Sequence, residues 1–232
     1  MSVYMCIDDT DSLDSIGTGR LARLLAEQIG QQYQVTAVTR HQLFVHPDIP
    51  YTSHNSCAVI HLCDIAEEAY LPLFNKAKIL MQEHFIEGSD PGIALAGSHQ
   101  ITPGMIAFGF DAKCTVLTQD RARKIASHAG ILLEGLGGTE GGVIGALAGI
   151  GLAASGSDGR YIQTGTIREK QGDQTIADIL TTGIERVITL DGKTITEGLV
   201  TVQKFPQPVR LQGKPILLVD EQEGRFVVVK RN

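Results

Sequence analysis

The sequence predicts an α+β protein, and three observations lead to this class. Short apolar runs typical of buried strands, such as Val3–Ile7 and Cys57–Leu62, are separated by segments with helical spacing of apolar residues. The chain after Arg168 is rich in strand-like runs and turn residues. Neither an internal repeat nor a low-complexity linker interrupts the 232 residues, a length that suits one large domain or two small ones.

The helices and strands of the first 168 residues are expected from the spacing of apolar residues. Helical spacing predicts helices over 20–29, 65–85, 120–128 and 143–154. Gly30 is a suitable end for the first helix, Pro72 a break or first-turn residue in the second, and Thr118 the N-cap of the third. Strands are expected at 3–7, 35–40, 42–45, 57–62, 93–96, 105–110, 113–117 and 161–168.

The remainder of the chain is expected to be a short strand-rich segment that begins after a polar, glycine-containing stretch at 169–173. Residues 186–190, the turn Asp191-Gly192 and the residues from Thr194 onward predict a β-hairpin. Further strands are expected at 199–202, 215–219 and 225–230.

Composition and charge narrow the cellular setting and the partners. The net charge of −6 gives little attraction for a phosphate backbone, so an RNA partner would need a local basic patch. The four cysteines form no C-x-x-C pair, which favours reduced thiols in a cytoplasmic protein. The start of the chain lacks the pattern of a signal peptide, and the apolar stretch 143–154 is too short to span a bilayer. We therefore expect a cytoplasmic protein without a membrane partner.

An acidic motif directly follows the first strand. It reads Asp8-Asp9-Thr10-Asp11-Ser12, with three carboxylates and two hydroxyls. Hard oxygen ligands crowded at the end of a strand suit Mg²⁺, which completes its coordination shell with water and substrate phosphates. Aspartates are also common in turns and at helix caps, so an acidic turn without a metal is the alternative. The motif by itself leaves both interpretations open.

Two glycine-containing turns each precede a predicted helix. Gly17-Thr18-Gly19 follows the acidic motif, and backbone N–H groups at a helix N-terminus attract phosphate. Residues 137–142 form a second glycine-rich loop before the helix at 143–154, and this loop matches neither a Walker A motif nor G-x-G-x-x-G. The alternative for this second loop is a plain turn that allows close helix packing.

Several segments share an ordered pattern with a known family. They are Ile7–Ser12, Gly17-Thr18, His46–Asn55, Asp90–Ile93 and Gly142–Gly151. Together they resemble the kinase-like domain of the archaeal tRNA-isoleucine agmatidine synthetases, the TiaS family. In the same order that family has I-D-D-T-D-S, a Gly-Thr turn, N-P-N-I-P-x-K-T-R-G-N, N-P-G-V and G-L-I-G-A-L-A-A-I-G.

The resemblance implies a fold and a division into domains. A kinase-like nucleotide-binding domain is expected over 1–62 and 135–170, interrupted by a ferredoxin-like domain over 63–134. A C-terminal strand-rich segment is expected over 171–232. The OB-fold and the zinc ribbon with which the family holds tRNA are expected to be missing, because no cysteine pairs are present and the segment is short.

The resemblance also assigns roles to residues of the acidic motif and the glycine turns. By this resemblance, Asp8, Asp9 and Asp11 would hold Mg²⁺–ATP. The mechanism we expect places Mg²⁺ on Asp8 and Asp11 and leaves Asp9 to orient or deprotonate the acceptor. Thr18 corresponds to a threonine that receives a phosphoryl group from ATP. The remaining nucleotide contacts are expected from Thr10, Ser12, Gly17, Asn55, Gly141 and Gly142.

The function implied is Mg²⁺–ATP-dependent phosphoryl transfer or substrate activation by a kinase-like or ligase-like enzyme. The acceptor is expected to be Thr18 itself or a small molecule, for which the family suggests an amine. Two alternatives remain at this point: a tRNA-modification subunit that relies on a separate RNA-binding partner, and a non-catalytic nucleotide-binding module.

Overall fold

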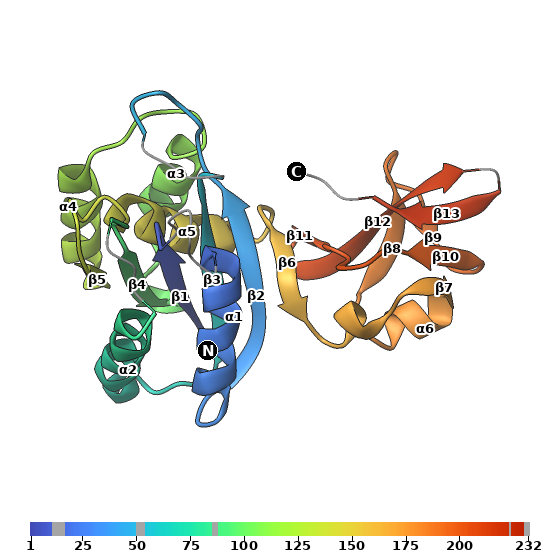
Figure 1. The fold of residues 1–232 in the computed structure, drawn as a ribbon, viewed down its shortest axis with the longest axis horizontal. Helices are drawn as coiled ribbons and strands as arrows, with labels where there is room; N and C mark the ends of the chain where they lie inside the picture. Colours follow the sequence, from blue (N-terminus) through green and yellow to red (C-terminus); the bar gives the residue numbers. More distant parts are fainter. Residues whose placement is uncertain (11–16, 50–53, 85–87, 223, 230–232) are drawn as a thin grey trace. The chain divides into compact units, whose positions relative to one another are not determined.

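The computed structural model describes residues 1–10, 17–49, 54–84, 88–222 and 224–229 (Figure 1). The chain divides into two compact units, Met1–Ser155 and Gly156–Asn232. The insertion over 63–134 and the C-terminal segment from residue 171 that the sequence analysis expected stay predictions.

The first unit is built on an antiparallel sheet with the strand order β5-β4-β1-β3-β2. Along the chain, its elements are β1 (Ser2–Asp8), α1 (Thr18–Gly30), β2 (Gln34–Gln42), β3 (Ser56–Cys63), η1 (Glu67–Ala69), α2 (Tyr70–Gln82), β4 (Gly92–Gly97), η2 (Ser98–Gln100), α3 (Pro103–Asp111), α4 (Gln119–Ala129), β5 (Leu132–Gly135) and α5 (Val143–Ser155).

The first part of this unit has the β-α-β-β-α-β order of a ferredoxin-like fold. Its four strands lie in the spatial order β4-β1-β3-β2, and every neighbouring pair is antiparallel. This arrangement covers Ser2–Gly97, whereas the sequence analysis expected it over 63–134. Strand β4 pairs with β1 from Val3–Gly97 to Asp8–Gly92, so part of the expected insertion shares a sheet with the expected flank.

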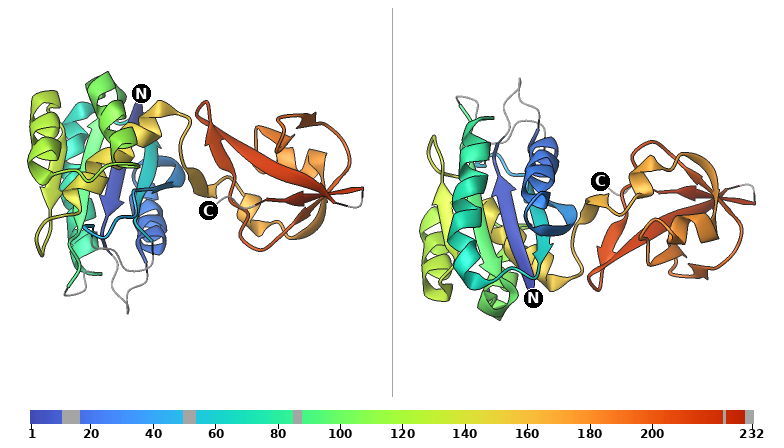
Figure 2. Two further views of the ribbon diagram at one scale, coloured as in Figure 1. Left: turned by 90° about the horizontal axis from the view of Figure 1, so that it is seen from above. Right: turned by 90° about the horizontal axis from the view of Figure 1, so that it is seen from below.

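Two layers of helices cover the two faces of the sheet (Figures 1 and 2). Helices α1 and α2 contact strands on one face, while α5 lies across β1, β3 and β4 on the other. Helices α3 and α4 pack against α5. Successive side chains of β1 alternate between the faces, so that Met5 and Ile7 point away from α5 while Cys6 and Asp8 point toward it. The α+β class expected from the sequence is confirmed.

Helix α3 corrects one prediction, because residues 105–110 were expected to form a strand. The hydroxyl of Thr102 accepts a hydrogen bond from the Met105 N–H at 3.3 Å, and Pro103 occupies the first turn, as in many helix starts. A side chain at Gly109 would approach Ala148 O at 2.8 Å, so this glycine allows α3 to lie close against α5. A short apolar run cannot distinguish a buried helix from a strand by its periodicity alone.

The segment 113–117 also differs from its prediction as a strand. It has no strand structure and connects α3 to α4. The expected N-cap of α4 is confirmed, because the Thr118 hydroxyl accepts a hydrogen bond from the Arg121 N–H at 3.3 Å. The expected strand at 161–168 is shorter in the structure, where it ends at Thr164 and a single 3-10 turn follows.

The second unit is rich in short strands, as the sequence predicted. Strands follow the order β6-β11-β12-β13-β10-β7, with β8 beside β12 and β9 beside β8. A core of aliphatic side chains from Ile167 to Val228 holds it together. Its elements are β6 (Arg160–Thr164), η3 (Ile167–Glu169), β7 (Gly172–Thr175), α6 (Ile176–Leu180), β8 (Arg186–Thr189), β9 (Thr194–Ile195), β10 (Leu199–Val202), β11 (Val209–Leu211), β12 (Lys214–Gln222) and β13 (Arg225–Val228).

Two expectations about the whole chain can be compared with the described residues. None of the described helices combines the length and the apolar character needed to cross a membrane. All four cysteines are free thiols; Cys6 and Cys57 are buried, Cys63 is half-buried and Cys114 is exposed.

Candidate functional site

A cavity of about 170 Å³ lies in the first unit, at the edge of the sheet where β1 ends and β3 begins. The N-terminal ends of α1 and α5 reach the same cavity, so segments distant in the sequence contribute to its walls. It is lined by Asp8, Asp9, Thr18, Leu43, Asp48, Ile49, His54, Asn55, Ser56, Asp90, Ala112, Thr115, Val116, Leu117, Thr139, Gly141, Ile144 and Gly145.

The carboxylate of Asp8 is enclosed between the sheet and helix α5. Asp8 is the last residue of β1 and is 7% exposed. A side-chain carbon at Gly145 would lie 1.8 Å from its Oδ2 atom, closer than any real contact. Only a glycine in the first turns of α5 leaves room for the carboxylate, and this close approach explains why the helix contains Gly145.

The neighbouring Asp9 turns the chain out of the sheet with an unusual backbone. Its φ of 51° lies in the left-handed region, which aspartate enters more readily than most residues that carry a side chain. The side chain of Asp9 also lines the cavity. Residues held in such conformations concentrate at functional sites, where the surrounding structure offsets their cost of about 1–3 kcal/mol.

Helix α1 begins at the cavity, and its N-cap residue is a glycine. Gly17 precedes the helix with a φ of 86°, a left-handed conformation that glycine adopts without strain. Thr18 is buried, and its Oγ1 accepts a hydrogen bond from the Thr10 hydroxyl at 3.0 Å. The partial positive charge of a helix N-terminus therefore faces the same cavity as the Asp8 and Asp9 carboxylates.

The second glycine loop is held by Asp90. The Thr139 N–H donates to Asp90 Oδ1 at 2.8 Å, and the Thr139 hydroxyl also donates to this carboxylate. The Gly142 N–H donates to Asp90 O at 3.0 Å, and a side-chain carbon at Gly142 would lie 2.4 Å from that oxygen. Several N–H groups of the loop thus already donate hydrogen bonds to other residues of the chain. Close packing is therefore the main role of Gly142 in this structure.

Asn55 joins the ends of strands β2 and β3 beneath the cavity. Its side-chain Nδ2 donates to Phe44 O at 2.6 Å, and its main-chain carbonyl oxygen accepts a hydrogen bond from the Leu43 N–H at 2.9 Å. Nearby, the Asp48 N–H donates to His46 Nδ1 at 3.2 Å, and the Asp48 side chain lines the cavity. Asn55 therefore shapes the wall as well as lining it.

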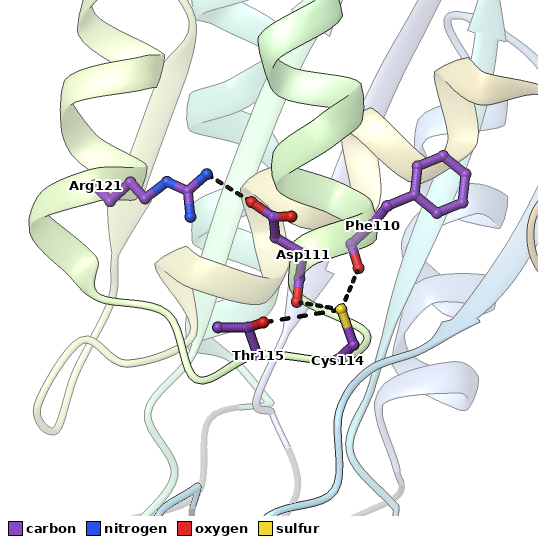
Figure 3. Close-up of polar contacts among 5 residues, drawn as sticks. All are labelled: Phe110, Asp111, Cys114, Thr115 and Arg121. Carbon is purple, nitrogen blue, oxygen red and sulfur yellow. Dashed lines mark hydrogen bonds and ion pairs between the residues drawn. The ribbon is translucent and has the colours of Figure 1, made fainter.

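The segment between α3 and α4 forms the most apolar part of the wall. Ala112, Val116 and Leu117 line the cavity together with Thr115. The Asp111 carboxylate pairs with Arg121 at 2.6 Å, and Figure 3 shows this ion pair bridging α3 and α4.

The turn of this segment is closed at Cys114. Its thiol donates to the carbonyls of Phe110 and Asp111, each at 3.6 Å, and lies 3.8 Å from the Thr115 hydroxyl (Figure 3). The Phe44 N–H donates to Ala112 O at 2.9 Å and ties the segment to the residues after β2. These contacts give an irregular segment a defined place at the cavity.

The structure brings together only part of the set of site residues expected from the sequence. Asp8, Asp9, Thr18, Asn55 and Gly141 line the cavity. Thr10 contacts Thr18, Gly17 precedes α1, and Gly142 packs behind the wall against Asp90. Asp11 and Ser12 lie outside the described residues. Within the described part of the chain, no three His, Cys, Asp or Glu side chains are grouped to hold a metal ion.

Sequence reasoning gave no role to Asp48, Asp90 or Thr139, although all three line the cavity. Asp48 and Asp90 both stand in segments of the shared motif pattern, which was the available signal. The pairing of Asp90 with Thr139 joins residues 49 positions apart, so only the tertiary structure reveals it.

The electrostatic character of the cavity is negative. Asp8, Asp9, Asp48 and Asp90 contribute carboxylates, and neither lysine nor arginine appears among the described residues that line it. Beneath Asp8, burial raises the pKa of the Cys6 thiol, and the hydrogen bond with Cys57 and the charge of Asp8 raise it further. Cys6 therefore stays protonated and is not a nucleophile.

Comparison with known proteins adds to this geometry. No protein-family model and no curated protein sequence matches the chain. Among solved structures, apo TiaS, a tRNA agmatidine synthetase, matches with a TM-score of 0.55 and 24% identity over 65% of this chain and 35% of TiaS. The complex of TiaS with its tRNA and ATP matches with a TM-score of 0.56 and 25% identity over 65% and 36%.

The chain resembles TiaS. A tRNA fluorescent labeling enzyme also matches, with a TM-score of 0.57 and 26% identity over 65% of this chain and 36% of the enzyme. The resemblance drawn from the sequence motifs is thus confirmed. The chain spans about a third of the length of these TiaS structures, one of which contains both tRNA and ATP.

Proposed function

We propose that the cavity binds Mg²⁺–ATP and that the protein uses the nucleotide for phosphoryl transfer or substrate activation. The observation that carries this proposal is the convergence of Asp8, Asp9 and the N-terminal turn of α1 on one cavity. The fold around it is shared with TiaS, one structure of which contains ATP. A pocket that combines carboxylates with backbone N–H donors suits a metal ion together with phosphates.

The residues present fit Mg²⁺. Carboxylate oxygens of Asp8 and Asp9 are the hard ligands that this ion prefers, and it normally keeps waters and binds substrate phosphates at its other positions. Asp11 remains a predicted ligand. Because carboxylates crowded into one cavity repel each other, a divalent cation would also relieve the repulsion with Asp48 and Asp90.

Each residue then has a defined task. The N–H groups in the first turn of α1 would bind phosphate oxygens, as at other helix N-termini. When bound, ATP supplies a phosphoryl group with ADP as the leaving group. Thr18 accepts a hydrogen bond from Thr10, which directs the Thr18 proton toward a second acceptor, and we assign Asp9 to receive it. A small-molecule hydroxyl or amine brought to the same place would be an equivalent acceptor.

A tRNA acceptor is the second candidate, favoured by the structural match to TiaS in complex with tRNA and ATP. The net charge of −6 gives the chain little general attraction for RNA. In this case a separate RNA-binding partner would deliver the tRNA. RNA that co-purifies with the protein and competes with ATP-dependent labelling would support the tRNA acceptor. A non-catalytic nucleotide-binding module would instead bind ATP without turnover.

Calorimetric titration of ATP with and without Mg²⁺ tests the proposal. We expect Mg²⁺-dependent binding in the natural protein and its loss in Asp8→Asn, which keeps the side-chain shape but removes the charge. Asp120→Asn is the matched control, because Asp120 is exposed and pairs only with Lys124 among described residues. Equal ATP affinity in Asp8→Asn and the natural protein would refute the metal assignment. Mass spectrometry of the mixture then shows whether a phosphoryl group is attached to the chain.

A further inference from the structure

The second unit contains a buried arginine without an acidic partner. Arg210, the middle residue of β11, is 7% exposed. Among the ion pairs between described residues, none includes Arg210. Arginine is rarely buried unless it is paired, because a charge that leaves water without a counter-ion is strongly destabilising. The charge of Arg210 therefore calls for an anion that the described part of the chain does not supply.

The side chain of Arg210 lies on the core face of the sheet in the second unit. Strand β11 lies between β6 and β12 (Figure 1), and Arg210 is paired with Pro215 of β12. Because side chains alternate along a strand, Pro215 shares its face with Leu217 and Val219, which belong to the aliphatic core. The guanidinium thus stands at the edge of an apolar core, where its charge is poorly solvated.

One edge of the guanidinium is fixed by Tyr161 of β6. Nη1 of Arg210 donates to the Tyr161 hydroxyl at 3.4 Å, and this hydroxyl donates to Gly213 O at 2.9 Å. The other edge carries Nε–H, which is buried and has no hydrogen-bond partner among the described residues. Nε–H and the adjacent N–H of Nη2 point in parallel, the geometry that binds two oxygens of a carboxylate or a phosphate. Arg210 is therefore held in place by one edge and presents the other to an anion.

Two glycine-containing turns adjoin the guanidinium. Gly213, in the turn between β11 and β12, has a φ of 77°, and a side-chain carbon there would lie 3.4 Å from Nη1 of Arg210. The Gly213 N–H donates to Gly156 O at 2.8 Å, and the Arg210 N–H donates to Gly159 O at 3.0 Å. The turns are thus joined to each other beside Arg210, and the absence of a side chain at Gly213 leaves space next to its charge.

We propose that Arg210 is the centre of an oxyanion-binding site in the second unit, which takes a phosphate or carboxylate group of a small ligand. Nε and Nη2 donate to two oxygens of this group, and the anion supplies the missing counter-charge. The ligand approaches beside the turn at Gly213. All residues of this site belong to the second unit, so the inference goes beyond the nucleotide binding proposed for the first unit and does not depend on it.

Hydrogen–deuterium exchange of the full chain in phosphate, acetate or chloride tests the site, at equal ionic strength and with EDTA to remove divalent cations. Phosphate should slow exchange several-fold in peptides covering 156–161 and 209–215 relative to 194–202 of the same unit, because a bound anion stabilises the two joined turns. Arg210→Met removes the charge and the donors and should abolish this protection. In chloride the same variant should melt at or above the temperature of the natural protein, because it lacks the uncompensated charge. Arg186→Met, at an exposed arginine of β8, is the control and should keep the protection.

Arg210→Lys decides the matter if Arg210→Met does not fold. Lysine keeps the charge but lacks the two parallel N–H groups, so protection by phosphate should fall markedly. Equal protection by acetate would identify a general oxyanion site, whereas protection by phosphate alone would identify a phosphate site. Protection that persists in both Arg210 variants would show that phosphate acts elsewhere and would overturn the proposal. So would exchange rates in the natural protein that are the same in phosphate, acetate and chloride, because water would then be sufficient to satisfy Nε.

Discussion

Substitution of Gly145 by alanine tests whether the position of the Asp8 carboxylate controls nucleotide binding. The new methyl group would lie 1.8 Å from Asp8 Oδ2 and 2.9 Å from Leu43 Cδ1. Ordinary contacts begin at 3.4 Å, so the carboxylate oxygen must retreat by about 1.6 Å. Binding sites tolerate displacements of only ~0.5 Å, so we expect Mg²⁺–ATP affinity to fall at least about tenfold.

The expected effect of Gly145→Ala on stability is smaller. Alanine favours a helix over glycine by about 1 kcal/mol, while overpacking costs about 1–3 kcal/mol, and Asp8 can relieve part of that cost by rotating. The net loss of roughly 0–2 kcal/mol corresponds to a fall in melting temperature of no more than about 8 °C. Calorimetric titration and thermal melting of the same sample separate the two effects.

Two glycines provide matched controls for Gly145→Ala. A methyl group at Gly149 would lie 2.3 Å and 2.7 Å from the buried sulfurs of Cys6 and Cys57, so Gly149→Ala should lower stability and leave ATP binding intact. At Gly104 in α3 the nearest atom is 3.7 Å away, so Gly104→Ala should change neither property for the worse. Unchanged ATP affinity in Gly145→Ala, or a loss as large in Gly149→Ala, would refute the role given to Asp8.

Three further predictions concern other residues. Thr18→Val should abolish any covalent phosphoryl adduct while ATP affinity stays within about threefold, and an adduct on the variant would place the acceptor elsewhere. Asp90→Ala should destabilise the protein by about 1–3 kcal/mol and speed amide exchange at Thr139, with Thr139→Val giving a smaller effect; equal exchange rates would contradict the role of Asp90. The hydrogen bond from the Thr175 hydroxyl lowers the pKa of Asp178. Ionised Asp178 therefore stabilises the fold at pH values above its pKa in the unfolded chain, and this contribution is lost as the pH falls through the lower pKa of the folded protein. Urea unfolding of Asp178→Asn across acidic pH should therefore show a weaker pH dependence, and an unchanged slope would contradict this assignment.

Local patterns in the sequence were sufficient where one short segment determines its own structure. The apolar run of β1 leads directly into Asp8, as predicted, and Thr118 caps α4. The turn Asp191-Gly192 joins β8 to β9 in an antiparallel hairpin, with Gly192 at a φ of 91°. In each case the side chains and backbone preferences of a few neighbouring residues carry the information.

The same reasoning fails where distant contacts decide the structure. From their sequence, residues 105–110 could form a buried strand or a buried helix. In the structure they form a helix, and Gly109 allows this helix to pack closely against α5. The β-α-β-β-α-β arrangement of Ser2–Gly97 was not predicted, because strand order depends on hydrogen bonds between segments and leaves little trace in composition.

The sequence by itself determined the α+β class, the acidic motif at the end of the first strand, the glycine before α1 and the resemblance to TiaS. These features depend on the order and spacing of nearby residues. Only the tertiary structure decided that Asp90 holds the loop at Thr139, that Gly145 makes room for Asp8, and that the segment at Val116 completes the cavity. Those contacts join segments that are distant in the sequence of the first unit, and their positions follow from the packing of α5 on the sheet and of α3 against α5, which no local pattern encodes.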